Sequence, residues 1–255
     1  MMRWVRYRTS AGYVAFGTLD GESIDEHEGD PFAGARPTGS RAKLADVALL
    51  APCEPSKIVA LWNNFHALAA KLDKPIPEHP LFLIKPASSV AGPGDPIERP
   101  AGYTGRIAYE GELGIVIGKR CRNVPPDEAA DCILGYTCVN DVTAVDVMTE
   151  NPHFTQWCRA KGYDTFGCLG PAIATGLDWQ TAKVVTRVDG VERQNYPLSD
   201  MVFSPTEQVS RISHDMTLLP GDVIACGTSL GVGSIRDGST VEVIIAGIGA
   251  LVNRL

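Results

Sequence analysis

Two glutamates stand one residue apart in the stretch YEGELGIVIGK, residues 109–119, immediately before a run of apolar residues. If residues 109–117 form a β-strand, Glu110 and Glu112 point to the same face, with Cα atoms roughly 6.5 Å apart because side chains alternate along a strand. Two carboxylates this close repel each other unless a positive charge lies between them. Taken alone, the pair is more simply explained as solvated acids at a strand end or as partners of a lysine.

A third acid favours a metal site over that explanation. The stretch LGYTCVNDVTAVD, residues 134–146, predicts a strand that ends in a polar turn at Asn140 and Asp141. Glu110, Glu112 and Asp141 would then place three carboxylates at two strand ends. Such a set can hold Mg²⁺, Mn²⁺ or Ca²⁺ while water or substrate oxygens complete the coordination shell. Asp146, five residues further along, is predicted to be structural.

The elements that must position these acids are predicted to be mainly strands. Short segments rich in β-branched residues alternate with turn-forming glycines and prolines along the 255-residue chain, which predicts a β-rich α+β fold with few helices. Residues 1–54 are predicted to form a small N-terminal β-meander domain that begins with two strands around the turn Ser-Ala-Gly, residues 10–12. Residues 55–255 are predicted to form the main domain, which is long enough to bury a substantial core.

Three segments are the best helix candidates. Residues 63–72 begin with two asparagines, either of which could serve as the N-cap, and residues 125–134 begin with prolines and acids. Residues 204–215 begin with Ser204 and Glu207 at the spacing of a capping box, in which each residue satisfies a backbone N–H of the other.

Charge and cysteine content limit the partners and the compartment. The net charge of −7 without a long basic run argues against nucleic acid and anionic membranes, and no apolar run is long enough to span a bilayer. The seven cysteines form no C-x-x-C pair, so free thiols are expected, and the start of the chain lacks the apolar stretch of a secretion signal. We therefore expect a cytoplasmic protein. An anionic substrate would need a local positive site, for which Lys85 and Arg106 are the candidates.

Four motifs occur in an order that resembles the fumarylacetoacetate hydrolase (FAH) superfamily: YEGELGIVIGK, GYTCVNDVTAVD, RAKGYDTFGCLGP and LLPGDVIACGTSLGVG. The likeness also includes PSKIVAL and LFLIKPASSVAGPGDPI, and it extends over nearly all of the chain from residue 50 onward. The resemblance implies a mixed β-roll catalytic domain like the FAH C-terminal domain, a bound divalent metal, usually Mg²⁺ or Mn²⁺, and usually a homodimer. Members cleave, decarboxylate or tautomerise 2-oxo and 1,3-dicarbonyl acids.

The resemblance also implies roles for single residues. The family's three metal carboxylates fall on Glu110, Glu112 and Asp141, and its active-site lysine falls on Lys161, which without its surrounding motif would be taken for a surface group. Thr228 matches a residue that binds the substrate carboxylate.

The glycine-rich loop GTSLGVG, residues 227–233, surrounds Thr228. From Gly227 onward, its backbone N–H groups could form an anion-binding nest, although a plain tight turn is an equal alternative. The loop lacks both the P-loop and the dinucleotide fingerprint, so nucleotide binding and a dinucleotide-dependent oxidoreductase are not expected.

One family feature is missing from the sequence. Hydrolytic members typically carry a His-Glu dyad that activates water, and this chain has Leu68 and Lys71 at those positions. His66 lies two residues early, which on a helix turns it about 200° away, so it substitutes only if the segment refolds over the substrate. Residues 63–80 could form such a mobile lid. The family's glutamine after the third acid is also missing, with Met148 near its place, and Gln156 is the residue that could compensate.

Without the dyad, a metal and a lysine suit reactions that need only enolate stabilisation and proton movement. The expected activity is therefore isomerisation or decarboxylation, as in the branch that acts on 2-hydroxyhepta-2,4-diene-1,7-dioate and on 5-carboxymethyl-2-oxo-hex-3-ene-1,7-dioate in aromatic catabolism. Tautomerisation of oxaloacetate and C–C hydrolysis of an acylpyruvate such as fumarylpyruvate are the enzymatic alternatives. The non-enzymatic alternative is a metal-stabilised binding domain.

Overall fold

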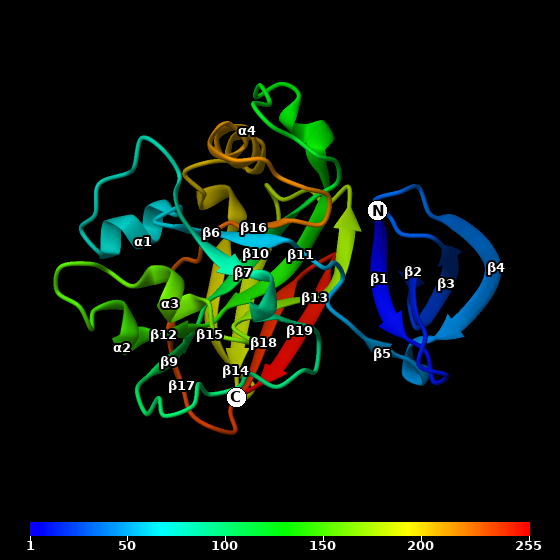
Figure 1. Ribbon diagram of the computed structural model, residues 1–255, viewed down its shortest axis with the longest axis horizontal. Helices are drawn as coiled ribbons and strands as arrows, with labels where there is room; N and C mark the ends of the chain where they lie inside the picture. Colours follow the sequence, from blue (N-terminus) through cyan, green and yellow to red (C-terminus); the bar gives the residue numbers. More distant parts are fainter.

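The computed structural model describes residues 1–255, and most of its regular structure is β-strand (Figure 1). The strands are β1 (Met2–Arg8), β2 (Val14–Asp20), β3 (Ser23–Glu28), β4 (Arg36–Lys43), β5 (Ala48–Leu49), β6 (Lys57–Trp62), β7 (Leu81–Pro86), β8 (Val90–Ala91), β9 (Ile107–Tyr109), β10 (Gly111–Ile117), β11 (Ile133–Asp141), β12 (Thr143–Ala144), β13 (Gly167–Thr175), β14 (Lys183–Val188), β15 (Val191–Pro197), β16 (Val223–Ala225), β17 (Gly233–Ile235), β18 (Thr240–Ile245) and β19 (Gly249–Arg254). The helices are α1 (His66–Lys71), α2 (Val145–Met148), α3 (Trp157–Lys161) and α4 (Pro205–Asp215), with four short 3₁₀ turns, η1 (Leu44–Asp46), η2 (Ala87–Ser89), η3 (Ala129–Cys132) and η4 (Leu198–Asp200). None of the helices is long and apolar enough to cross a bilayer.

Three sheets are formed by these strands. The largest has twelve strands in the order β4-β3-β2-β1-β13-β11-β10-β16-β6-β7, with β5 beside β1 and β8 beside β13. It is a mixed sheet, because β16 runs parallel to β6 and β8 runs parallel to β13 while the other neighbours are antiparallel. A four-stranded sheet, β15-β14-β18-β19, packs against it, and β12-β9-β17 forms a small third sheet. The prediction of a β-rich fold is confirmed.

Strand β10 lies in the middle of the large sheet, and all seven of its residues are buried. Leu113, Ile115 and Ile117 belong to the main core cluster, whereas Val116 belongs to a second cluster together with Val139. The two sets point to opposite faces because side chains alternate along a strand. Both faces of this strand therefore pack against core residues, and the strand is held rigidly on both sides.

A close approach at Gly111 brings β10 against the four-stranded sheet. A Cβ atom at this position would lie 2.0 Å from the Oγ1 atom of Thr186 on β14, so a larger residue would force Thr186 to shift. Glycine therefore lets the two sheets meet closely at the start of β10.

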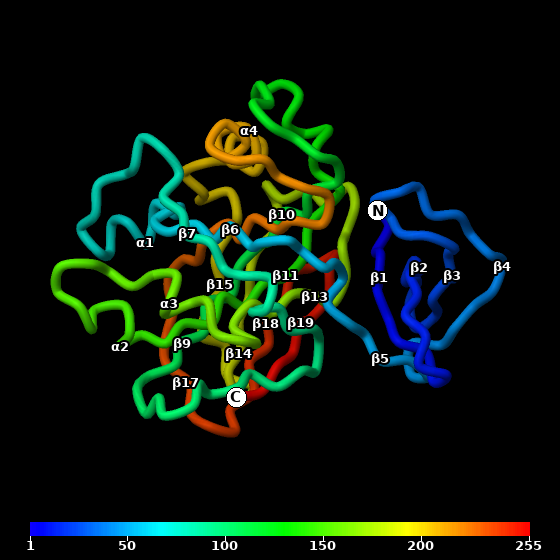
Figure 2. Tube along the Cα trace, viewed as in Figure 1, coloured from blue at the N-terminus to red at the C-terminus, as the bar shows by residue number.

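The N-terminal strands form a separate lobe in projection but remain part of the large sheet (Figures 1 and 2). Strands β1 and β2 pair as the predicted hairpin, and β3 and β4 extend the antiparallel meander. Residues Met2–Trp4 of β1 also pair with Ile173–Thr175 of β13 in the main body. A domain division at residues 54 and 55 stays a proposal.

The helix predictions succeed only in part. Helix α4 begins after Ser204, with both hydrogen bonds of the predicted capping box present. The segment 63–72 is helical only from residue 66, and the predicted asparagine N-cap is wrong because Phe65 occupies that position. Asn64 instead holds the segment to the body, since its side chain donates to the Cys226 carbonyl at 2.8 Å and accepts from the Phe203 N–H at 2.9 Å.

The predicted helix at residues 125–134 is also wrong. Only η3 forms there, and β11 begins directly after it at Ile133. Ile133 pairs with Ile117 of β10, so the pairing of β11 ends the helical turn at Cys132. Tertiary strand pairing outweighs the local helix signal in this segment.

The capping box of α4 makes a testable contribution to stability. In the Ser204→Ala variant the Glu207 N–H loses its side-chain acceptor, at a cost of about 1 kcal/mol, so the melting temperature should fall by about 2–4 °C for a chain of this size. The hydrogen bond from Ser204 lowers the pKa of Glu207 below its ordinary value of 4.5. The carboxylate therefore contributes stability above that pH and loses it as the pH falls, and the difference between variant and wild type should shrink in acid. Thermal unfolding at neutral and acid pH measures both effects.

Ser234→Ala is the matched control, because Ser234 is exposed on β17 and a surface substitution of this kind changes stability by less than about 0.5 kcal/mol. Equal losses in the two variants would contradict a specific role for the capping box.

Candidate active site

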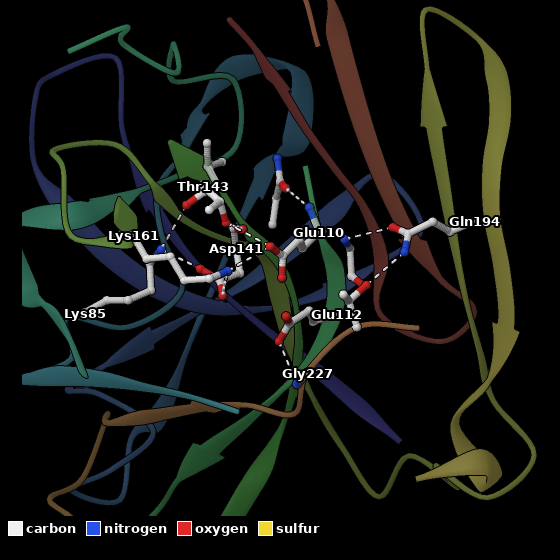
Figure 3. A network of polar contacts seen from close by, with 12 residues as sticks. Lys85, Glu110, Glu112, Asp141, Thr143, Lys161, Gln194 and Gly227 are labelled. Carbon is white, nitrogen blue, oxygen red and sulfur yellow. Dashed lines mark hydrogen bonds and ion pairs between the residues drawn. The ribbon is translucent and has the colours of Figure 1, made fainter. Parts of the chain in front are cut away.

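Three carboxylates meet where β10 begins and β11 ends. Glu112 is the second residue of β10, Asp141 is the last residue of β11, and Glu110 interrupts the chain between β9 and β10. The Glu110 N–H donates to the side-chain oxygen of Asn140 at 3.1 Å, which accounts for the interruption. One oxygen from each of the three acids lies within 4.8 Å of the other two (Figure 3).

This arrangement fits a hard divalent cation. Two oxygens on opposite sides of one Mg²⁺, Mn²⁺ or Ca²⁺ ion are about 4–5 Å apart, because each metal–oxygen distance is about 2.0–2.6 Å, so the separation in the protein is suitable. The Oε1 atom of Glu112 is buried and has no hydrogen-bond partner. Buried polar atoms are rarely left unpaired, so this oxygen is the structural observation that most favours a ligand here.

Two lysines share the site with the acids. The Lys161 ammonium donates to Asp141 Oδ2 at 2.6 Å and to Glu110 Oε1 at 2.9 Å, and the Lys85 ammonium donates to Asp141 Oδ1 at 2.5 Å. With every group ionised, three carboxylates face two ammonium groups, so one negative charge remains uncompensated.

The pKa values of these groups follow from burial and from each other. Burial alone would lower the pKa of Lys161, but the carboxylates of Asp141 and Glu110 raise it above the usual value. Burial lowers the pKa of Lys85, and the Asp141 carboxylate opposes this only in part. Burial would raise the pKa of Asp141, but the two lysines lower it. Lys161 therefore carries a firmly held proton.

The surroundings of Glu112 favour its protonated, neutral form. It is fully buried, and burial together with the carboxylates of Asp141 and Glu110 raises its pKa well above the ordinary range. Its Oε2 atom accepts the N–H of Gly227 at 2.8 Å. Gly227 has a φ of 87°, a conformation that favours glycine, so the loop can turn its N–H onto this carboxylate. The N–H of Gly227, at the start of the loop for which an anion-binding nest was one alternative, is therefore bound to a protein acid.

A second set of hydrogen bonds fixes the backbone between the two glutamates. The Gly111 N–H donates to Gln194 Oε1 at 3.0 Å, and the Gly111 carbonyl accepts from the hydroxyls of Tyr196 at 2.6 Å and Thr228 at 3.0 Å. The Gln194 amide also donates to Thr228 Oγ1 at 2.8 Å. Every polar atom of Gly111 is therefore satisfied by the loop and the four-stranded sheet.

Sequence reasoning missed Gln194, Tyr196 and Thr143, whose hydroxyl donates to Glu110 Oε1 at 2.8 Å. The only available signal was the spacing of Gln194 and Tyr196, two residues apart in a polar strand, which places both on one face. Nothing in the sequence shows that this face meets Gly111.

A cavity of about 290 Å³ opens onto the site. Glu110, Lys161 and Thr228 line its polar part, and Glu110 is the one acid of the three with an appreciably exposed side chain, at 18% against 1% for Asp141. The walls are mostly apolar and include Leu61, Trp62, Leu68, Leu83, Met148 and Trp157. A small acid could therefore reach the carboxylate cluster from this side.

Three predicted site residues lie elsewhere. Arg106 forms an exposed ion pair with Asp146 at 2.8 Å and does not line the cavity, because Asp146 also accepts its backbone N–H. His66 is exposed at the start of α1 and likewise does not line the cavity. Gln156 precedes α3, and its amide donates to the carbonyl of Phe154 outside the cavity. Lys85 does reach the site, but its ammonium forms an ion pair with Asp141.

Comparison with known proteins connects this site to a family. Residues 57–255 match the protein family described as fumarylacetoacetate (FAA) hydrolase C-terminal, and residues 2–52 match the one described as Rv2993c-like, N-terminal. The chain is 37% identical over 226 residues to the oxaloacetate tautomerase YisK of Bacillus subtilis, and the alignment covers 83% of this chain and 74% of that protein.

Two solved structures are similar over almost their whole length. The 2-hydroxyhepta-2,4-diene-1,7-dioate isomerase from Mycobacterium marinum gives a TM-score of 0.90 at 40% identity and covers 100% of this chain and 98% of its own. The maleylpyruvate hydrolase from Sphingobium sp. SYK-6, in complex with manganese(II) and pyruvate, gives a TM-score of 0.78 at 29% identity and covers 98% of each chain. The three relatives carry three different activities, so the likeness does not by itself select a reaction.

Glu112→Gln separates metal binding from folding. The amide oxygen can still accept the Gly227 N–H, and it removes the cost of burying an acid with a raised pKa. In the presence of chelator the variant should therefore melt no lower than wild type. Mg²⁺ or Mn²⁺ should raise the melting temperature of wild type, because a ligand present at about 100 times its Kd adds about 2.7 kcal/mol to the folded state. This shift should largely disappear in the variant.

Glu22→Gln, at an exposed acid of the N-terminal lobe, is the control and should keep the full metal-induced shift. A shift of the same size in both variants would show that Glu112 is not a ligand.

Proposed function

We propose that this chain, which belongs to the fumarylacetoacetate hydrolase family, is a divalent-metal-dependent enzyme that stabilises the enolate of 2-oxo acids. The observation that carries the proposal is the constellation of Glu110, Glu112, Asp141 and Lys161 beside the cavity. Mg²⁺ or Mn²⁺, with Ca²⁺ as the alternative, would be held by the three acids and would supply a Lewis acid for the 2-oxo oxygen and the adjacent carboxylate of the substrate.

The protein's own residues supply the proton chemistry and the environment. Lys161 lines the cavity with its ammonium group, so it can donate a hydrogen bond to the oxygen of an enolate placed there and, where the substrate displaces its carboxylate partners, a proton to the enolate carbon. Asp141 and Glu110 fix its position through two hydrogen bonds. A substrate between the apolar walls would displace water, which would strengthen the electrostatic interactions between substrate and site.

The cavity favours isomerisation or decarboxylation over hydrolysis. Leu68 and Lys71 line it where hydrolytic members would carry their His-Glu dyad, and His66 does not line it. No histidine lies among the residues that line the cavity, so none is placed there to activate water. We therefore propose 2-hydroxyhepta-2,4-diene-1,7-dioate and related 2-oxo dicarboxylates as substrates, in agreement with the similarity to an isomerase.

Two other activities have specific support. Tautomerisation of oxaloacetate is supported by the relative YisK and needs the same enolate chemistry. Hydrolysis of an acylpyruvate is supported by the similarity to a maleylpyruvate hydrolase, but it requires a base other than the missing dyad. In the non-enzymatic alternative, a metal-stabilised binding domain, the cation would affect stability alone.

The setting of the enzyme is also part of the proposal. All seven cysteines are free thiols, which supports a cytoplasmic location. A homodimer is expected by analogy with the family, and size-exclusion chromatography coupled to light scattering would test it.

An ultraviolet assay tests the reaction directly. Oxaloacetate, fumarylpyruvate and 2-hydroxyhepta-2,4-diene-1,7-dioate are each followed with Mg²⁺ or Mn²⁺, with and without chelator. We expect metal-dependent isomerisation, decarboxylation or tautomerisation and slow or absent C–C hydrolysis. Rapid hydrolysis of fumarylpyruvate without the other activities would overturn the proposed order, and inactivity toward all three with an intact metal-induced stabilisation would favour the binding domain.

Lys161→Met should separate catalysis from metal binding. Without the proton donor we expect kcat to fall by a factor on the order of 10²–10⁴, while the metal-induced rise in melting temperature persists because all three acids remain. Lys119→Met removes an exposed lysine that follows β10 and does not line the cavity, and it should leave kcat within about twofold. Full activity of the Lys161 variant would exclude it as the proton donor.

A further inference from the structure

We propose that Lys71 determines substrate specificity by binding a second carboxylate at the far end of the substrate. The preferred substrates would then be dianions, with a 2-oxo acid group at one end, an apolar middle and a carboxylate at the other end. This inference rests on the proposed function and specifies which 2-oxo acids the site selects.

The lining of the cavity divides into regions of different chemistry. The polar region, with Glu110, Lys161 and Thr228, lies against the carboxylate cluster. The walls carry large apolar side chains, among which the rings of Trp62 and Trp157 lie 5.8 Å apart at a tilt of 50°. Such walls suit a hydrocarbon or polyene segment and offer no partner to a charge.

Lys71 is the exception in this apolar part of the lining. It is the last residue of α1, it lines the cavity between Leu68 and Leu72, and it forms no ion pair. Lys161, the other lysine in the lining, is held by Asp141 and Glu110. Lys71 is therefore the only cationic group of the lining that is free to meet an anion.

The other positive groups near the site are already committed. The Lys85 ammonium is buried against Asp141, and Arg106 is paired with Asp146 outside the cavity. Lys71 is exposed, so a distal carboxylate beside its ammonium would keep part of its hydration, whereas a carboxylate against the apolar walls alone would lose hydration without compensation, which is costly. A substrate that ends in a methyl group at the same place would bury apolar surface and gain nothing from the ammonium.

A matched pair of probes isolates this effect. 2-Oxoheptanedioate and 2-oxoheptanoate share the 2-oxo acid end and the seven-carbon chain, and they differ only in a terminal carboxylate or methyl group. Their affinities in the presence of Mg²⁺ can be measured from tryptophan fluorescence, because two of the four tryptophans line the cavity. Magnesium-dependent exchange of the C3 protons with deuterium, followed by NMR, reports enolisation of the same two compounds separately.

We expect wild type to bind the dioate more tightly than the monocarboxylate, by a factor on the order of ten for a charge-assisted contact at a partly exposed lysine. Lys71→Met should remove most of this preference, measured as the ratio of the two dissociation constants. Lys74→Met is the matched control: Lys74 lies three residues further along, is exposed and does not line the cavity, so its variant should keep the wild-type ratio.

Two results would overturn the assignment. Equal ratios in wild type and Lys71→Met would show that the distal carboxylate does not use Lys71, and proton exchange in either compound would then leave the proposed function intact. A loss of preference as large in Lys74→Met would show a general charge effect instead of a contact. Absence of proton exchange from both compounds, despite measurable binding, would be a failure of the proposed function and not of the contact with Lys71.

Discussion

Five ionisable groups, three carboxylates and two ammonium groups, lie together at the ends of β10 and β11 in the interior of the protein. Charges removed from water must compensate each other, and taking away one partner of a buried pair typically costs about 3–5 kcal/mol. Asp141 carries most of this compensation, because each of its two oxygens accepts a different lysine. The three carboxylates outnumber the two ammonium groups by one, and this excess would suit the divalent cation that the proposed function requires. The site is thus balanced for a cation and a substrate together.

The rest of the fold keeps this charge cluster from rearranging. Strand β10 is packed on both faces, so the Cα positions of its residues are fixed by the core. Gly111 lets the four-stranded sheet approach closely enough for Gln194 and Tyr196 to bind its amide and carbonyl. The backbone positions of the two glutamates on either side of Gly111 are therefore fixed. Preorganisation of this kind is what electrostatic catalysis requires, because no energy is then spent on reorienting ligands during the reaction.

Local patterns in the sequence predicted the pair of glutamates, the strand after them and the capping box of α4, because each depends on residues that are close together in the chain. Asp141 was added because it ends a second predicted strand. The N-cap of α1 and the helix expected at residues 125–134 failed, because in both places contacts with distant segments determine the conformation. Arg106 was a candidate substrate ligand because it lies four residues before Glu110. Its guanidinium instead pairs with Asp146, forty residues away. Gln194 could not have been found, since its role exists only once two sheets meet.

The continuity of the large sheet gives the N-terminal strands a further importance. Strand β13 lies next to β11, which ends at Asp141, and its other edge is covered by β1 and β8. Almost every residue of β13 is buried. Without β1, the backbone N–H and C=O groups of residues 173–175 would form an open, apolar sheet edge, which is the kind of surface that pairs with other chains and leads to aggregation. Strand β1 therefore closes an edge through which the main body could otherwise self-associate, although it lies far from the carboxylate cluster.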